Sequence, residues 1–266
     1  MASRRHPLAR LGGARAAVFA AALLVWLGSG ASARAQTDEI QVYDATIEQP
    51  HRVSVEFHNN YTPIGRTVPD FPGGVVPNHT LNGVPEWAYG ATDWLELGAY
   101  LPLYTVTNTG YFELDGGKLR ALFVSPHARE REIFYGINFE LSFNARHWEP
   151  TRRSGEIRPI IGTHLGPWDL IFNPIIDTGF NGVARLDFAP AERVAYNFSA
   201  LWGAAVEHYA DYGHFRDLLP PKQQFQTLFA VIDYNGEPTS VEFGVGHGFT
   251  AASDALVLKL MITHNF

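Results

Sequence analysis

The sequence predicts an all-β fold, an antiparallel up-and-down transmembrane β-barrel of about twelve strands spanning residues 51–266. Three observations predict it. Apolar and polar residues alternate over long stretches, as side chains do on the two faces of a strand. Clusters of turn residues separate these stretches. The polar face is rich in Gly, Asn, Ser and Glu, whereas Lys, which soluble surfaces use freely, occurs only at Lys118, Lys222 and Lys259.

Residues 1–35 have the pattern of a cleaved secretory signal peptide. Arg4, Arg5 and Arg10 precede an apolar run over 16–27, and Ala33-Arg34-Ala35 closes the segment. The alternative, a membrane anchor, is disfavoured because the run is too short to span a bilayer. We expect cleavage before Gln36 and an N-terminal arm over 36–50, in which 39–47 could form a further short strand.

Composition excludes several classes of protein. The chain has no Cys, which excludes a disulfide scaffold, a thiolate metal site and a cysteine nucleophile. Residues 36–266 carry 15 basic and 27 acidic side chains, a formal charge of −12. No basic cluster is large enough to neutralise a run of phosphates, so no nucleic-acid partner is expected. An exported protein without cysteine fits a bacterial envelope.

The alternation is clearest in segments 52–58, 95–103, 133–144, 241–246 and 256–266. In 133–144, for example, Phe139 falls on the apolar face and Glu140 on the polar face. The weakest prediction is 193–209, which also fits a helical period, although unbroken alternation favours a strand. The twelve strands are expected near 51–60, 83–92, 94–107, 116–125, 131–145, 155–165, 168–177, 183–189, 193–209, 222–234, 238–249 and 254–266.

The same alternation fits a soluble barrel with an apolar interior, and further features favour the membrane alternative. Several segments exceed nine residues, enough for a tilted strand to cross a bilayer. Glycines such as Gly98 and Gly244 lie on the polar face, where a closed wall crowds side chains inward. Trp94 and Trp168 open strands and Trp148 closes one, as an interfacial girdle requires.

Connection lengths support this orientation. With the C-terminus in the periplasm, the short turns fall on one side and the long loops on the other, as in outer-membrane barrels. The longest loop, 61–82, would be a lid over the mouth or a surface recognition loop. The expected short turns are 92–93, 126–130, 166–167, 190–192 and 235–237, and the expected external connections are 61–82, 108–115, 146–154, 210–221 and 250–253.

Three stretches resemble known proteins. The ending LVLKLMITHNF (256–266) resembles the C-terminal strand of Gram-negative outer-membrane barrels, which implies that Phe266 belongs to the signal read by the barrel-assembly machinery. The stretch AYGATDWLELGAYLPLY (88–104) resembles the strand–turn–strand of the outer-membrane family associated with meta-pathway phenol degradation, and 241–262 has a similar rhythm. The resemblance implies an outer-membrane location, with outer-membrane lipid and the assembly machinery as partners.

Charged residues on the inward face are the candidate functional residues. They indicate a narrow porin-like channel for small solutes; a plug of mutual salt bridges that closes the lumen, leaving a structural or interaction role, is the alternative. Acids outnumber bases, so a conduit would mildly favour cations or neutral solutes. The expected lumen-lining residues are Arg52, Glu56, Glu96, Arg120, Glu140, Arg158, Glu207, Glu242 and Lys259, with His58 and Glu86 on the same face.

No cofactor, metal site or catalytic residue is expected. HExxH and GxSxG are absent, and His58 stands isolated on its strand. A lipid-modifying outer-membrane enzyme is the third alternative, for which Ser142, His147 and His164 are the residues to test.

Overall fold

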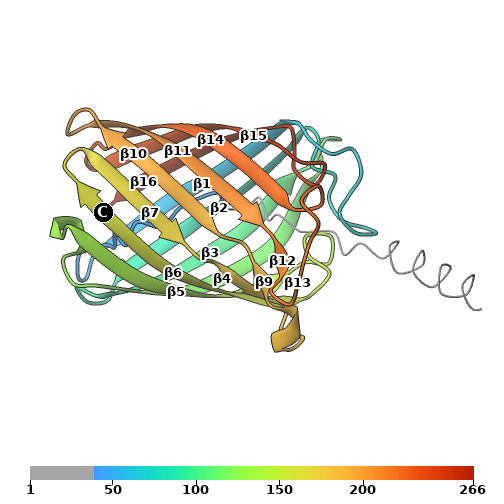
Figure 1. The fold of residues 1–266 in the computed structure, drawn as a ribbon, viewed down its shortest axis with the longest axis horizontal. Helices are drawn as coiled ribbons and strands as arrows, with labels where there is room; N and C mark the ends of the chain where they lie inside the picture. Colours follow the sequence, from blue (N-terminus) through green and yellow to red (C-terminus); the bar gives the residue numbers. More distant parts are fainter. Residues whose placement is uncertain (1–38) are drawn as a thin grey trace, which may run out of the picture. The chain divides into compact units, whose positions relative to one another are not determined.

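The computed structural model describes residues 39–266, so the predicted signal peptide lies outside the described residues. Twelve antiparallel strands form a closed barrel (Figure 1), because β1 pairs with β16 and β6 pairs with β7. This confirms the predicted fold class. The barrel strands are β1 (Val53–Ile64), β2 (Thr80–Gly90), β3 (Leu95–Val106), β4 (Phe112–Val124), β5 (Ile133–Asn144), β6 (Arg153–Leu165), β7 (Trp168–Asn173), β10 (Ala191–Asn197), β11 (Trp202–Asp211), β14 (Phe225–Tyr234), β15 (Thr239–Gly248) and β16 (Leu256–Asn265).

Four short strands extend the wall beyond β6. They are β8 (Ile176–Thr178), β9 (Asp187–Phe188), β12 (Gly213–His214) and β13 (Asp217–Leu218). β8 pairs with β6, β9 with β8, β12 with β9 and β13 with β12. Residues 39–266 contain no helix of the length and apolarity needed to cross a membrane.

The predicted number of strands is right, but two of the predicted strands are wrong. Residues 183–189 contain the short 3-10 helix η2 (Val183–Arg185) and the two-residue β9, and they belong to the loop between β7 and β10. A second short 3-10 helix, η1, spans Ala128–Glu130. Residues 193–209 form two strands, β10 and β11. The Ser199 hydroxyl accepts hydrogen bonds from the backbone N–H groups of Leu201 and Trp202, which stabilises a turn inside an apparently unbroken alternation. Neither a single strand nor a helix forms there.

The other errors follow from these. The connection at 190–192, predicted as a short turn, lies at the long-loop side, and the short turn is 198–201. Strand 168–177 stops at Asn173 because Pro174 follows and has no N–H to donate to a ladder. The arm residues 39–47 form no strand.

The two ends of the barrel differ as predicted. At one end, which we call the short-turn end, lie the C-terminus and the connections at 91–94, 125–132, 166–167, 198–201 and 235–238. The opposite long-loop end carries 65–79, 107–111, 145–152, 174–190, 212–224 and 249–255. Arg66 ties the first of these loops to the last through a 3.1 Å ion pair with Asp254.

The outer surface is apolar. Phe139 is 42% exposed, whereas Glu140 beside it is 7% exposed, so apolar side chains face outward and polar ones inward. On β16 the buried residues are Val257, Lys259 and Met261, in alternation with Leu258 and Leu260 outside. An outward apolar face is what a transmembrane barrel presents to lipid.

Aromatic side chains gather at the short-turn end. Trp94 and Trp168 are exposed there as predicted, with stacked or tilted aromatic neighbours. Trp148 is not part of a girdle, because it packs inward against a buried cluster that includes Tyr100 and Leu103. The additional exposed aromatic residues at this end include Tyr89, Tyr135, Tyr196, Phe198, Trp202, Tyr234 and Phe266.

Candidate functional site: the barrel lumen

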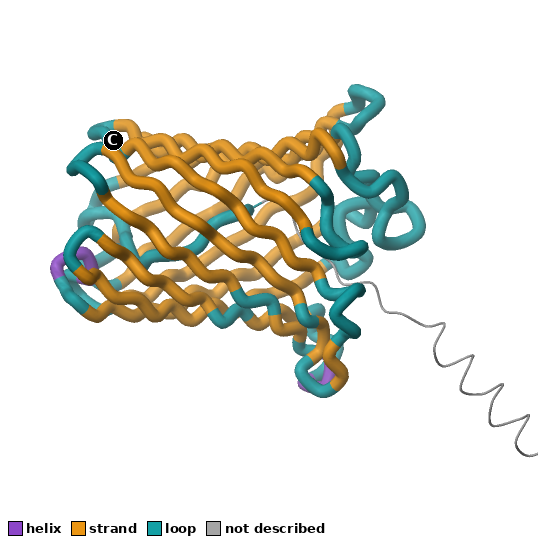
Figure 2. The backbone as a smooth tube through the Cα atoms, turned by 45° about the horizontal axis from the view of Figure 1, so that its top comes forward, coloured by secondary structure: helices purple, strands orange, loops and turns teal. Residues whose placement is uncertain are grey.

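Residues 39–48 of the N-terminal arm lie inside the barrel and narrow its interior (Figure 2). Ile40, Val42 and Tyr43 are buried against inward side chains of the wall. The wall makes room for the arm at Gly90, where a Cβ atom would lie 2.2 Å from the carbonyl oxygen of Gln49. The absence of a side chain at Gly90 therefore allows the backbone of the arm to approach the backbone of β2 closely.

Hydrogen bonds to the wall hold the arm. The Asn173 side chain on β7 accepts from the Tyr43 N–H at 2.7 Å and donates to the Tyr43 carbonyl at 3.0 Å. The Glu48 N–H donates to Glu96 at 2.6 Å, and the Lys259 ammonium donates to the Ile40 carbonyl at 3.1 Å. The arm therefore satisfies its own backbone groups with wall side chains rather than with a strand partner.

Tyr43 of the arm is buried and contacts polar side chains of the wall. Its hydroxyl shares a hydrogen bond with the Tyr100 hydroxyl of β3, and the Arg158 guanidinium lies 4.3 Å from the centre of its ring. Burial raises the pKa of the Tyr43 phenol well above its usual value, so the group stays neutral and keeps its proton for hydrogen bonding.

The first of three ionic clusters joins β10, β11, β14, β15 and β16. The fully buried Lys259 ammonium lies 2.5 Å from both Glu207 and Glu242. Arg193 contacts these two glutamates and Asp233, at 2.5 Å from the last. A buried cation is tolerable only where carboxylates compensate its desolvation, and this cluster supplies three.

The second cluster crosses β2, β3 and β4. The Arg120 guanidinium bridges Glu86 and Glu96, with 2.6 Å to Glu96. Gly98 makes room for it, since a Cβ at that position would lie 2.6 Å from the Arg120 side chain.

The third cluster connects β4, β5 and β6 to the arm. Arg158 lies 2.6 Å from Glu156 and 3.2 Å from Glu39 of the arm. Lys118 lies 3.7 Å from both Glu39 and Glu140. Charged pairs thus add to the hydrogen bonds that hold the arm to the wall.

The structure places most of the expected lining residues inside the barrel and brings them into these clusters. Arg52 is the exception, because it is exposed at the short-turn end, where it donates to the Phe266 carbonyl at 3.3 Å. Sequence reasoning missed Lys118, Glu156, Arg193 and Asp233. Lys118 and Glu156 each lie two positions before an expected lining residue and therefore on the same face of the strand. The alternation could have predicted that both point into the barrel. Glu39 carried no such signal, since its arm is not a strand.

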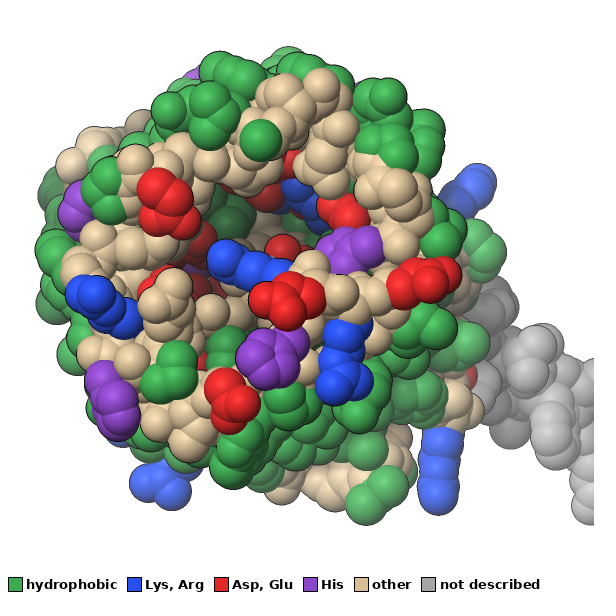
Figure 3. Space-filling view, turned by 90° about the vertical axis from the view of Figure 1, so that its left-hand side faces the viewer, with side chains coloured by type: hydrophobic (Ala, Val, Ile, Leu, Met, Phe, Trp, Pro, Cys, Tyr) green, Lys and Arg blue, Asp and Glu red, His purple; other side chains and the backbone are tan. Residues whose placement is uncertain are grey.

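A cavity of about 690 Å³ lies between the arm and the wall. Figure 3 shows the hollow from the short-turn end, with acidic and basic side chains around and inside it. Its acidic lining residues outnumber the basic ones. The charged residues around it are Asp44, Glu48, Glu56, Glu86, Glu96, Asp169, Asp233, Glu237 and Glu242 against Arg120, Arg129 and Arg193.

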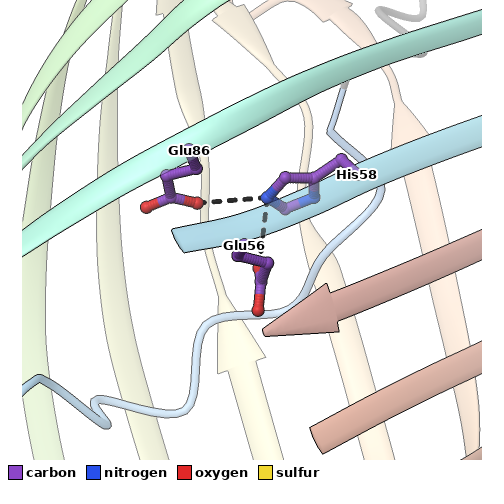
Figure 4. A group of neighbouring side chains, drawn as sticks. All are labelled: Glu56, His58 and Glu86. Atoms are coloured by element: carbon purple, nitrogen blue, oxygen red, sulfur yellow. Dashed lines mark hydrogen bonds and ion pairs between the residues drawn. The ribbon is translucent and has the colours of Figure 1, made fainter. Parts of the chain in front are cut away.

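One group on this lining has donor atoms close enough to share a metal ion. Glu56, His58 and Glu86 place one potential ligand atom each within 4.8 Å of one another (Figure 4), so His58 is not isolated as expected from the sequence. The residues considered for an enzyme are not gathered in this way. His147 hydrogen-bonds Asp115 and His164 hydrogen-bonds Asp169, and the described residues show no hydrogen bond from Ser142 to either histidine.

Among solved structures, this chain is similar to an outer-membrane channel from Pseudomonas putida F1, with a TM-score of 0.57, 12% identity, and coverage of 86% of this chain and 100% of that one. The fold is shared. Weaker matches are a deletion mutant of the TodX monoaromatic hydrocarbon channel, at a TM-score of 0.46 and 6% identity over 82% of this chain and 90% of that one, and the CymD monoaromatic hydrocarbon channel, at 0.44 and 10% over 82% and 89%. No family model and no curated protein matches the sequence.

Proposed function

We propose that this chain is an outer-membrane channel for small solutes, with a conduit narrowed by its own N-terminal arm. The observation that carries the proposal is the cavity of about 690 Å³ between the arm and the wall of the closed barrel, which is lined by charged side chains. A barrel of twelve strands is wider than the eight-stranded ones that side chains fill completely. Of the lining residues expected from the sequence, Glu56, Glu96, Arg120 and Glu242 line this cavity.

The charge of the lining supports selection against anions. Nine acidic and three arginine side chains surround the cavity, and a ring of one sign of charge repels solutes of that sign. We expect neutral solutes and small cations to pass more readily than anions. The resemblance of 88–104 to the family associated with phenol degradation makes small neutral aromatic compounds the first solutes to test.

Conductance through planar bilayers tests the proposal. The purified barrel is expected to conduct with a reversal potential that favours K⁺ over Cl⁻ under a salt gradient. The increase in uptake that the protein causes over protein-free liposomes should be larger for phenol than for benzoate, because the two solutes have similar size and differ in charge. A folded protein, identified by its heat-modifiable mobility on gels, that passes neither ions nor solutes would contradict the proposal.

Variants of the arm sharpen the test. Asn173→Ala removes both hydrogen bonds to the Tyr43 backbone. We expect it to loosen the arm and to raise the mean conductance or its fluctuation, with deletion of residues 39–48 giving a larger rise. Thr109→Ala, in an exposed loop at the opposite end, serves as the control and should conduct like the unmodified chain.

A closed lumen with an interaction role is the second candidate. Three ionic clusters and the arm fill much of the interior, which favours it. In that case deletion of the arm would open a pore that the complete chain lacks.

A further inference from the structure

The strands β1 and β2 place two carboxylates directly opposite each other on the inward face. Glu56 and Glu86 are cross-strand partners in the antiparallel register, and like charges in this position destabilise a sheet unless something compensates them. His58 lies two residues further along β1, on the same face. Its Nε2 atom lies 3.1 Å from Glu56 Oε1 and 3.1 Å from Glu86 Oε2 (Figure 4).

Protein cations do not balance this group. Among residues 39–266, Arg120 is the only Arg or Lys that forms an ion pair with Glu86 and Glu96, and no Arg or Lys forms one with Glu56. Three carboxylates therefore share one permanent cation. If His58 is protonated the excess is one negative charge, and if it is neutral the excess is two.

Hydrogen bonding by His58 does not account for the arrangement. A single N–H at Nε2 faces two carboxylates at equal distance and cannot point at both. The other ring nitrogen, Nδ1, is buried and has no partner among the described residues. An imidazolium here would leave one charged N–H buried without an acceptor, which is costly.

We infer that Glu56, His58 and Glu86 form a binding site for a divalent transition-metal ion of the zinc type. One imidazole nitrogen and two carboxylate oxygens suit such ions, whereas Ca²⁺ and Mg²⁺ prefer all-oxygen sites. Ligands about 2.0–2.2 Å from a metal lie roughly 3 Å apart, which agrees with the 3.1 Å separations. Both glutamates line the cavity, so water can reach the ion.

Neighbouring residues orient the ligands. The Gln41 side chain of the arm donates to Glu56 Oε1 at 3.0 Å, and the Thr263 hydroxyl of β16 donates to the other oxygen of Glu56. Arg120 holds the second oxygen of Glu86. Such outer contacts fix carboxylate orientation in metal sites, and here one of them connects the site to the arm.

Zinc titration of the purified, folded barrel tests the site. Isothermal titration with Zn²⁺ is expected to give one saturable site per chain in the full-length protein, and His58→Gln should abolish it. Gln41→Ala should weaken binding roughly tenfold, as loss of an outer contact does in other metal sites. The matched control is His164→Gln, since His164 also lines the cavity and pairs with one carboxylate, Asp169, and with no second one in the described part of the chain. This variant should bind zinc like the unmodified chain.

A spectroscopic measurement covers the possibility that His58→Gln does not fold. X-ray absorption at the zinc edge of the unmodified chain should show one nitrogen and two oxygen protein ligands at about 2.0 Å. The inference is overturned if the unmodified chain binds zinc no better than Glu56→Gln, or if the bound ion lacks an imidazole ligand. The measurement needs no solute movement, so it can fail or succeed independently of the proposed channel.

Discussion

The wall of this barrel consists of two unlike regions. The regular arc, β14–β16 with β1–β6, has strands of ten to thirteen residues, whereas in the irregular arc, residues 168–218, β7 has six and β10 has seven. At the border between the two arcs, β6 changes partner: residues 161–165 pair with β7, and residues 155–157 pair with β8. The difference shows that alternation alone predicts the strands where the wall is continuous. In the irregular arc, prolines and local turns end strands at positions that the alternation does not mark.

Pro174 and Pro190 mark the borders of the interruption. β7 ends directly before the first and β10 begins directly after the second. Proline lacks the N–H that a ladder needs, and a long loop with its own short strands replaces the wall between these two prolines, whereas Pro159 is accommodated within β6. The irregular arc therefore supplies Asn173, which holds the arm, and the short strands of the loop. The regular arc supplies most of the charged side chains that point into the barrel.

The largest expected effect concerns the interior of the regular arc. Lys259→Met leaves Glu207 and Glu242 with Arg193 as their sole cation partner in the described structure, because Lys259 lies 2.5 Å from both. Loss of one partner from a buried ion pair costs about 3–5 kcal/mol of unfolding free energy. Urea unfolding in detergent measures this loss, and Lys222→Met in the exposed loop 212–224 should leave the free energy of unfolding unchanged. Equal stability of the two variants would contradict the role given to Lys259.

A smaller effect is expected on the outer surface. Phe139 lies near the middle of β5 and faces outward, so Phe139→Arg should cost about 2–4 kcal/mol in a bilayer. Val183, which is 74% exposed in the loop of the irregular arc, tolerates the same change with little cost. Refolding into lipid vesicles at graded urea concentrations separates the two. If both variants lose the same stability, Phe139 does not face lipid.

The smallest effect is expected within the irregular arc. His214 and Asp187 form a 2.7 Å pair between β12 and β9, and both side chains are 36% exposed. Exposed pairs contribute about 0–1 kcal/mol, so His214→Ala should change the unfolding midpoint barely at all. A loss comparable to that of Lys259→Met would show that the short strands support the wall.

Sequence alone was sufficient for the fold class and for the division of side chains between two faces. The predicted number of strands agrees with the structure because two errors cancel: 183–189 is not a barrel strand, and 193–209 forms two. Alternation at period two placed Phe139 and Glu140 on opposite faces, since a strand sends successive side chains to opposite faces. The scarcity of Lys on the polar face, its glycines and the strand lengths then assigned Phe139 to the outside. The same period located Glu207, Glu242 and Lys259. It failed at 193–209, because the Ser199 turn keeps the alternation in phase across the break.

Only the tertiary structure decided which inward residues meet and what lies among them. Glu56, His58 and Glu86 converge because of the β1–β2 register, and register depends on pairing across the whole sheet rather than on either strand. The arm has no periodic pattern, so its place inside the barrel follows from partners remote in sequence, such as Asn173, which lies 130 positions beyond Tyr43. Local periodicity determines the direction in which a side chain points, and three-dimensional closure determines the partner that it reaches.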